Sequence, residues 1–221
     1  MSQLRLPPVL WPGTSRGLGL TAFAAVAGYL VGSVPTATFL GRMRGIDLRT
    51  EGSGNPGTVN ALRVSGLWLA ALVLLMEATK GYGAVFLGAW LADETGAVAA
   101  GLGAVTGNVY NVWHRFRGGK GLAISLGVLA GLWPAVIVPV LVVIIVGVLV
   151  SRSSGIASLT AIVGLIIMAS LWSVNRWPTG GVEPGSQLVV LAAGIAVVIF
   201  WRHWQDAPFS GPAHRESPES G

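Results

Sequence analysis

The sequence contains no cysteine and few charged residues. The absence of cysteine among the 221 residues excludes disulfides and thiolate catalysis. Only 10% of the residues are charged, 52% are hydrophobic, and the mean hydropathy is +0.68. Soluble domains carry about 25% charged residues, so this composition predicts an integral membrane protein. The net charge of +5 is expected to set topology and meet membrane lipid, with no nucleic-acid partner.

The common catalytic motifs are also missing. The three histidines, His114, His203 and His214, show no paired metal-ligand spacing, so we expect no metal site. No G-x-S-x-G nucleophile motif occurs. A reaction in this chain would therefore depend on substrate positioning and charge stabilisation.

Apolar segments fill most of the chain, which predicts an all-α, polytopic membrane domain over residues 18–204 with about seven transmembrane helices. A crossing needs about 20 residues. We expect residues 59–76 and 81–92 to share one crossing as a broken helix, interrupted at Glu77, Lys80 and Gly81, with Glu77 and Lys80 forming a salt bridge. The segments are 18–41, 59–76, 81–92, 96–113, 122–132, 135–150, 156–172 and 186–201.

The distribution of basic residues predicts the orientation. Cytoplasmic loops are enriched in lysine and arginine, which places the N-terminus outside and the C-terminus inside. We expect residues 1–17 to form an external leader and residues 205–221 a disordered cytoplasmic tail. The inside group is Arg42, Arg44, Arg49, Arg63, Arg115, Arg117, Lys120, Arg152, Arg202 and Arg215, and the outside group is Arg5, Arg16 and Arg176.

The first polar segment, Gly45–Arg63, is a glycine-rich interruption between apolar helices. Glycines that adopt positive φ let successive N–H groups point into one concavity, and arginine forks suit phosphate. These features predict a phosphate site, although a flexible loop remains open as an alternative. The residues concerned are Arg49, Gly52, Ser53, Gly54, Asn55, Gly57, Thr58, Asn60 and Arg63.

The second polar segment, Gly107–Gly121, ends in Arg117-Gly118-Gly119-Lys120-Gly121 directly before an apolar run. Glycine N–H groups, a helix N-terminus and an ammonium group resemble a phosphate cradle. A basic loop that only sets topology is the alternative for this segment alone. Two such segments on one membrane face favour a cytoplasmic site for phosphorylated substrates. At the end of the last helix, His203 and Asp206 are expected to share a face. The alternative is a helix end whose basic residues only complement the helix dipole.

Taken together, these segments resemble the bacterial acyl-phosphate:glycerol-3-phosphate acyltransferases of the PlsY type. The resemblance covers about residues 29–203. It rests on GSVPTATFLGRMRGIDLRTEGSGNPGTVNALR, then LLMEATKG, then RFRGGKGLAISLGVLAG, then the terminal Arg202-His203. It implies a seven-helix enzyme of the bacterial inner membrane, acting as a monomer without metal or other cofactor. It also implies acyl phosphate and glycerol 3-phosphate as substrates and lysophosphatidic acid as product.

The resemblance assigns site residues position by position. It implies catalytic roles for Ser53, Arg63, Lys120 and His203. It implies substrate or phosphate binding by Arg49, Gly52, Gly54, Asn55, Asn60, Gly118, Gly119, Gly121 and Asp206.

The chain departs from the family pattern at several positions, which leaves a second hypothesis open. Asn108 stands where the family has histidine, and Gly155 stands where a serine is usual. Trp204 and Asp206 replace an arginine and an asparagine of the terminal pattern. The second hypothesis is a diverged, non-catalytic relative that binds or transports a phosphorylated metabolite or lipid.

Overall fold

The computed structural model describes residues 17–204, and every regular element in this range is helical. The predicted leader (apart from Gly17) and the predicted tail, with Asp206, lie outside the described residues. In chain order the elements are α1 (Leu18–Ser33), α2 (Thr36–Arg42), α3 (Thr58–Ser65), α4 (Leu67–Val109), η1 (Val112–His114), α5 (Leu122–Leu132), η2 (Pro134–Val136), α6 (Ile137–Ser151), α7 (Ser154–Asn175) and α8 (Ser186–Trp204).

Five stretches of the described chain are long and apolar enough to cross a membrane, which agrees with the predicted class. They are Leu18–Arg42, Leu67–His114, Pro134–Ser151, Gly155–Asn175 and Ser186–Trp204. The second has 48 residues, far more than the roughly 20 that one crossing needs. α5, with 11 residues, is an additional short apolar helix.

The predicted break of a helix at Glu77, Lys80 and Gly81 is wrong. α4 runs through these residues, and its non-helical residues are Ala92 and Asp93, with φ +52° at Asp93. Glu77 and Lys80 form the expected ion pair, Oε2 to Nζ 2.9 Å, so the two charges neutralise each other on one helix face and no break is required. A Cβ at position 81 would lie 2.2 Å from the Ile124 carbonyl oxygen, so the glycine serves close packing against α5.

Two apolar segments that look continuous in the sequence are divided. The first ends α1 at Ser33 and restarts as α2 at Thr36, because Pro35 has no N–H and disfavours helical geometry in the residue before it. The second is divided at Gly66, whose φ is +80°. The first division leaves the short helix α2 just before the first polar segment, and the second leaves the short helix α3, which contains the end of that segment.

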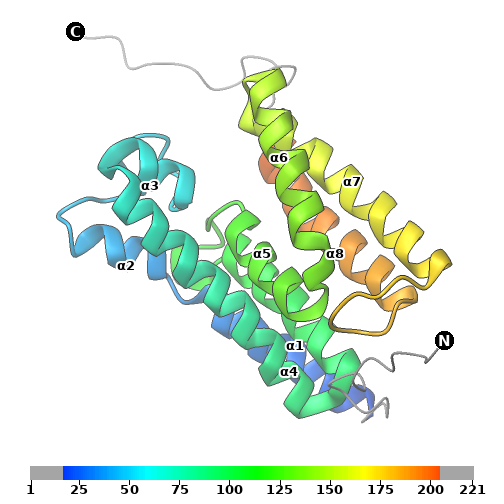
Figure 1. The fold of residues 1–221 in the computed structure, drawn as a ribbon. Coiled ribbons are helices and arrows are strands. Elements are labelled where there is room, and N and C mark those ends of the chain that lie inside the picture. Colours follow the sequence, from blue (N-terminus) through cyan, green and yellow to red (C-terminus); the bar gives the residue numbers. More distant parts are fainter. Residues whose placement is uncertain (1–16, 205–221) are drawn as a thin grey trace, which may run out of the picture.

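Small residues allow the helices to approach closely. A Cβ at Gly28 of α1 would lie 2.0 Å from the Ala100 carbonyl oxygen of α4, so these two backbones are in contact, as is common where membrane helices pack. The main core joins α4, α5, α6, α7 and α8, and a smaller core lies under α3. Figure 1 shows α2 and α3 at the end of the bundle where α5 begins.

Candidate active site

The first polar segment is organised by one buried side chain, Asn60, in the first turn of α3. Asn60 Oδ1 accepts from Ser53 N at 2.7 Å, and Nδ2 donates to the carbonyl oxygens of Leu48 and Glu51, both at 3.0 Å. The Asn60 amide is thus used within the segment and shapes the loop. Ser53 lies on its exposed side.

The glycines of this segment only partly follow the prediction. Gly52 and Gly54 have φ of +63° and +68°, as predicted. The expectation of positive φ at Gly57 is wrong: its φ is −152°, because it is the N-cap of α3, a position that takes extended geometry. At Gly52 a Cβ would lie 2.3 Å from Asn60 Oδ1, so glycine is needed there for space as well as for conformation.

The part of the second polar segment that follows α4 folds back onto the end of that helix. Gly118 N donates to Val109 O at 2.9 Å, and Gly119 N donates to Asn108 O at 3.0 Å. These two N–H groups therefore bind the protein's own backbone instead of forming an open cradle. The glycines allow close approach, since a Cβ at Gly118 would lie 1.9 Å from Asn108 O. At the end of the segment, Gly121, with φ +83°, is the N-cap of α5.

The two polar segments are in contact, as the sequence predicted. Arg49 Nη1 donates to Arg117 O at 3.0 Å. A Cβ at Gly119 would lie 3.4 Å from Pro56 O. Residues 68 positions apart in the chain are therefore joined, and the two segments form one surface beside the start of α5.

A cluster of positive charge lies at this contact. Burial, followed by the charges of Arg202 and Arg63, lowers the pKa of Lys120 below that of a free lysine. Arg202 Nη2 also donates to Gly118 O at 3.1 Å. Arg202 was not among the site residues expected from the sequence, although its place next to His203 in the last turn of α8 was the available signal.

His203 is buried, with 1% of its surface exposed. Its Nδ1 lies 2.9 Å from the carbonyl oxygen of Ile199, and a carbonyl only accepts, so Nδ1 carries the hydrogen and Nε2 has the free lone pair. Nε2 has no partner among the described residues. The predicted partner Asp206 lies outside the described range.

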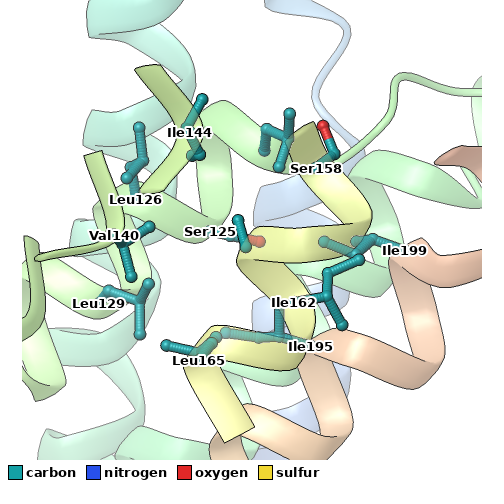
Figure 2. A pocket seen from close by; sticks show the side chains of 12 residues that line it. Ser125, Leu126, Leu129, Val140, Ile144, Ser158, Ile162, Leu165, Ile195 and Ile199 are labelled. Atoms are coloured by element: carbon teal, nitrogen blue, oxygen red, sulfur yellow. The ribbon is translucent and has the colours of Figure 1, made fainter. Parts of the chain in front are cut away.

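An apolar pocket begins next to this cluster and continues between α5, α6, α7 and α8 (Figure 2). Ile199, one turn before His203, lines it, and a Cβ at Gly121 would lie 2.8 Å from the Ile199 side chain. Ser125 Oγ is buried in its wall without a partner among the described residues. The lining comprises Leu122, Ser125, Leu126, Leu129, Val140, Ile144, Ser158, Ala161, Ile162, Leu165, Ile195 and Ile199.

A second, polar pocket lies under the glycine pair Gly118–Gly119. The buried carboxylate of Glu77 and the side chain of Asn108 contribute to its wall. In the described part of the chain no group of three or more histidine, aspartate or glutamate side chains is placed to hold a metal ion. The other lining residues are Val34, Pro35, Ala37, Thr38, Pro56, Asn111 and His114.

The similarities of this chain to known proteins all indicate the same family. A family model described as glycerol-3-phosphate acyltransferase matches residues 22–208. A glycerol-3-phosphate acyltransferase of Symbiobacterium thermophilum is 39% identical over 182 residues, 82% of this chain and 86% of that protein. One from Agrobacterium fabrum is 37% identical over 185 residues, 83% of this chain and 85% of that protein.

The fold is also similar to a solved membrane enzyme. The crystal structure of PlsY (YgiH), an integral membrane glycerol 3-phosphate acyltransferase in its glycerol 3-phosphate form, superposes with a TM-score of 0.70. That match has 27% sequence identity and covers 84% of this chain and 88% of that chain. The lysophosphatidic acid form superposes with a TM-score of 0.69 at 26% identity, covering 83% and 87%.

Proposed function

The chain belongs to the glycerol-3-phosphate acyltransferase family, and we propose that it transfers a fatty acyl group from an acyl phosphate to glycerol 3-phosphate. The products are lysophosphatidic acid and inorganic phosphate. This reaction is the first step of phospholipid synthesis. The protein that carries it out is a multi-pass membrane enzyme. The reaction requires no metal or other cofactor, because the mixed anhydride is already activated.

One observation carries the proposal: a cluster of positive charge lies next to one end of α5, and an apolar pocket begins at that end. Lys120 is close enough to Arg63 and Arg202 for their charges to lower its pKa. Gly121, the next residue, packs against Ile199 in the pocket wall. An acyl phosphate has the matching shape, with a phosphate at one end and an alkyl chain at the other. Glycerol 3-phosphate adds a second phosphate for the remaining cations.

The proposed chemistry needs no nucleophilic side chain. The 1-hydroxyl oxygen of glycerol 3-phosphate bonds to the acyl carbon, the bond from that carbon to the phosphate oxygen breaks, and a phosphate oxygen takes the proton. Arg63 and Lys120 stabilise the charge that develops on phosphate. Ser53 and the Nε2 lone pair of His203 orient the substrates.

The other site residues have supporting roles in this proposal. Arg49, through its bond to Arg117 O, joins the two polar segments beside the phosphates. Asn60 acts as a positioning residue, because its amide is used within the first segment. Asp206, which lies outside the described residues, is also proposed to bind substrate. The remaining proposed contacts are Gly52, Gly54, Asn55 and Gly121, whereas Gly118 and Gly119 hold the loop against the end of α4.

The proposed topology has seven crossings. It counts α4 as two passes joined by the turn at Ala92 and Asp93 and counts the short helix α5 as one. Both polar segments then face the cytoplasm, with the leader outside and the tail inside. We propose that the protein acts as a monomer, since one chain provides all the groups named above.

The test of this function is turnover by the reconstituted protein. Palmitoyl phosphate and glycerol 3-phosphate are supplied, and inorganic phosphate and lysophosphatidic acid are measured, with Lys120→Ala as control. We expect both products in equal amounts. Saturable binding of glycerol 3-phosphate without turnover would instead indicate the non-catalytic relative.

As the pH rises, phosphate binding is expected to weaken at a lower pH than it would with a lysine of unperturbed pKa. The pKa of Lys120 is lowered by burial and by Arg202 and Arg63, so its charge, present below that pKa, is lost as the pH rises through it. The ratio kcat/KM, which reports groups of the free enzyme, should fall on the alkaline side. Lys120→Arg, whose guanidinium stays charged, should move this fall to higher pH. Identical alkaline limbs in the two proteins would contradict the assignment.

The apolar pocket is expected to hold the acyl chain. Ala161→Phe places a ring in the pocket lining, so long chains should lose favourable burial, about 0.8 kcal/mol per methylene. The kcat/KM for palmitoyl phosphate should fall more than that for a chain about half as long. Val163→Phe, at a position of the same helix that is 57% exposed, is the matched control. An unchanged ratio between the two chain lengths in Ala161→Phe would place the acyl chain elsewhere.

A further inference from the structure

We propose that Asn108 is a positioning residue. It links the glycine pair Gly118–Gly119 of the second polar segment to the buried carboxylate of Glu77 and so holds this part of the segment in place. This inference rests on the proposed function, because it concerns how the Lys120 loop is held for catalysis.

Glu77 is buried, with 5% of its surface exposed, and its carboxylate contacts Lys80 and Thr36. Lys80 Nζ lies 2.9 Å from Oε2, and Thr36 Oγ1 of α2 donates to Oε1. The same ammonium donates to the carbonyl oxygens of Gly32 and Val34, at 3.2 and 2.7 Å, where α1 ends before Pro35. The carboxylate is therefore a fixed point that α1, α2 and α4 define together.

Asn108 connects this fixed point to the glycine pair. Its side-chain Nδ2 donates to Glu77 Oε2 at 2.6 Å. Its backbone carbonyl oxygen accepts a hydrogen bond from Gly119 N at 3.0 Å. The next carbonyl, that of Val109, accepts from Gly118 N. Both acceptors belong to the last turn of α4, which would fray more readily without an anchor. Lys120 follows this glycine pair directly.

The direction of the hydrogen bond restricts what can occupy position 108. An ionised carboxylate only accepts, so residue 108 must donate. An amide and an imidazole can both do so, whereas an aliphatic side chain of similar size cannot. Histidine at position 108 would therefore keep the donor, and leucine would remove it.

The experiment compares Asn108→Leu and Asn108→His, with Thr106→Val as the control on the same helix. Thr106 Oγ1 donates only to Leu102 O of its own helix in the described structure. Two quantities are measured: kcat and KM with palmitoyl phosphate and glycerol 3-phosphate, and the mobility of a nitroxide label on Arg117→Cys. The label is specific because the chain contains no other cysteine.

Asn108→Leu is expected to reduce kcat/KM about tenfold to a hundredfold, as displaced catalytic groups do, and to make the label more mobile. Asn108→His and Thr106→Val should resemble the parent protein in both measurements. A leucine variant with parental kinetics and label mobility would overturn the inference. A histidine variant with reduced kcat/KM and a mobile label would do so too, and it provides the test if the leucine variant does not fold.

Failure of this inference is distinguishable from failure of the proposed function. If the parent protein shows no turnover, the proposed function fails, while the label still reports whether Asn108 holds the loop. If the parent turns over and the leucine variant matches it, only the positioning role of Asn108 fails.

Discussion

Replacing Lys120 by methionine is expected to lower turnover about 10²- to 10³-fold, the range found when one group that stabilises developing charge is removed. The methionine side chain keeps the apolar stem but removes the charge that would face the leaving phosphate. Since Lys120 is partly buried beside Arg63 and Arg202, the remaining arginines should keep some affinity for substrate phosphate. The loss should therefore appear mainly in kcat. Single-turnover release of phosphate from palmitoyl phosphate measures it.

Arg152→Met is the matched control for the loss of charge. Arg152 is exposed and follows α6, and it is not among the charges that act on Lys120. This variant should turn over like the parent protein. Parental kcat in Lys120→Met would remove Lys120 from the chemistry, and an equal loss in both variants would indicate a general effect of charge.

The membrane class and the meeting of the two polar segments could be predicted because their signals are local. Low charge and apolar runs define a lipid environment, and glycines with basic residues mark where the chain leaves it. The contact between Arg49 and Arg117 follows once both segments are placed at the same end. The ion pair of Glu77 and Lys80 was also visible, because isolated charges in apolar helices are usually paired.

The wrong prediction at Glu77–Gly81 shows where local signals fail. A charged pair followed by glycine has the same sequence pattern whether the helix breaks there or packs closely against a neighbour. The neighbour that decides the question is Ile124 of α5, more than 40 residues later in the chain. Its identity depends on the three-dimensional packing and is absent from the local sequence.

The position of Asn60 could be predicted, but its use could not. Its partners are backbone groups of Leu48, Glu51 and Ser53, whose directions depend on how the loop turns at Gly52. A polar side chain in a glycine-rich segment is equally compatible with binding a ligand and with shaping the loop. The same uncertainty applied to Asn108, whose donor role depends on a carboxylate 31 residues earlier.

Gly118→Ala is expected to lower kcat/KM about a hundredfold, comparable to the cost of misplacing reacting groups by about 1 Å. A Cβ there would lie 1.9 Å from Asn108 O and 2.9 Å from Val109 O, and backbone atoms cannot move aside as a flexible side chain would. The alanine would separate the loop from the end of α4 and shift Lys120. Steady-state kinetics with both substrates, together with a thermal unfolding curve, measures the change and checks folding.

Gly119→Ala is the informative partner of that variant. Its Cβ would meet Asn108 Oδ1 at 3.2 Å and Pro56 O at 3.4 Å, contacts that shifts of a few tenths of an ångström relieve, so the loss should be much smaller. The comparison distinguishes two states of the loop. If the loop works in the conformation described here, with both glycine N–H groups bonded to α4, Gly118 is the sensitive position. If the loop instead opens so that both N–H groups bind phosphate, the two alanine variants should lose similar factors in kcat/KM. Phosphate would then be bound by these N–H groups as well as by the cations.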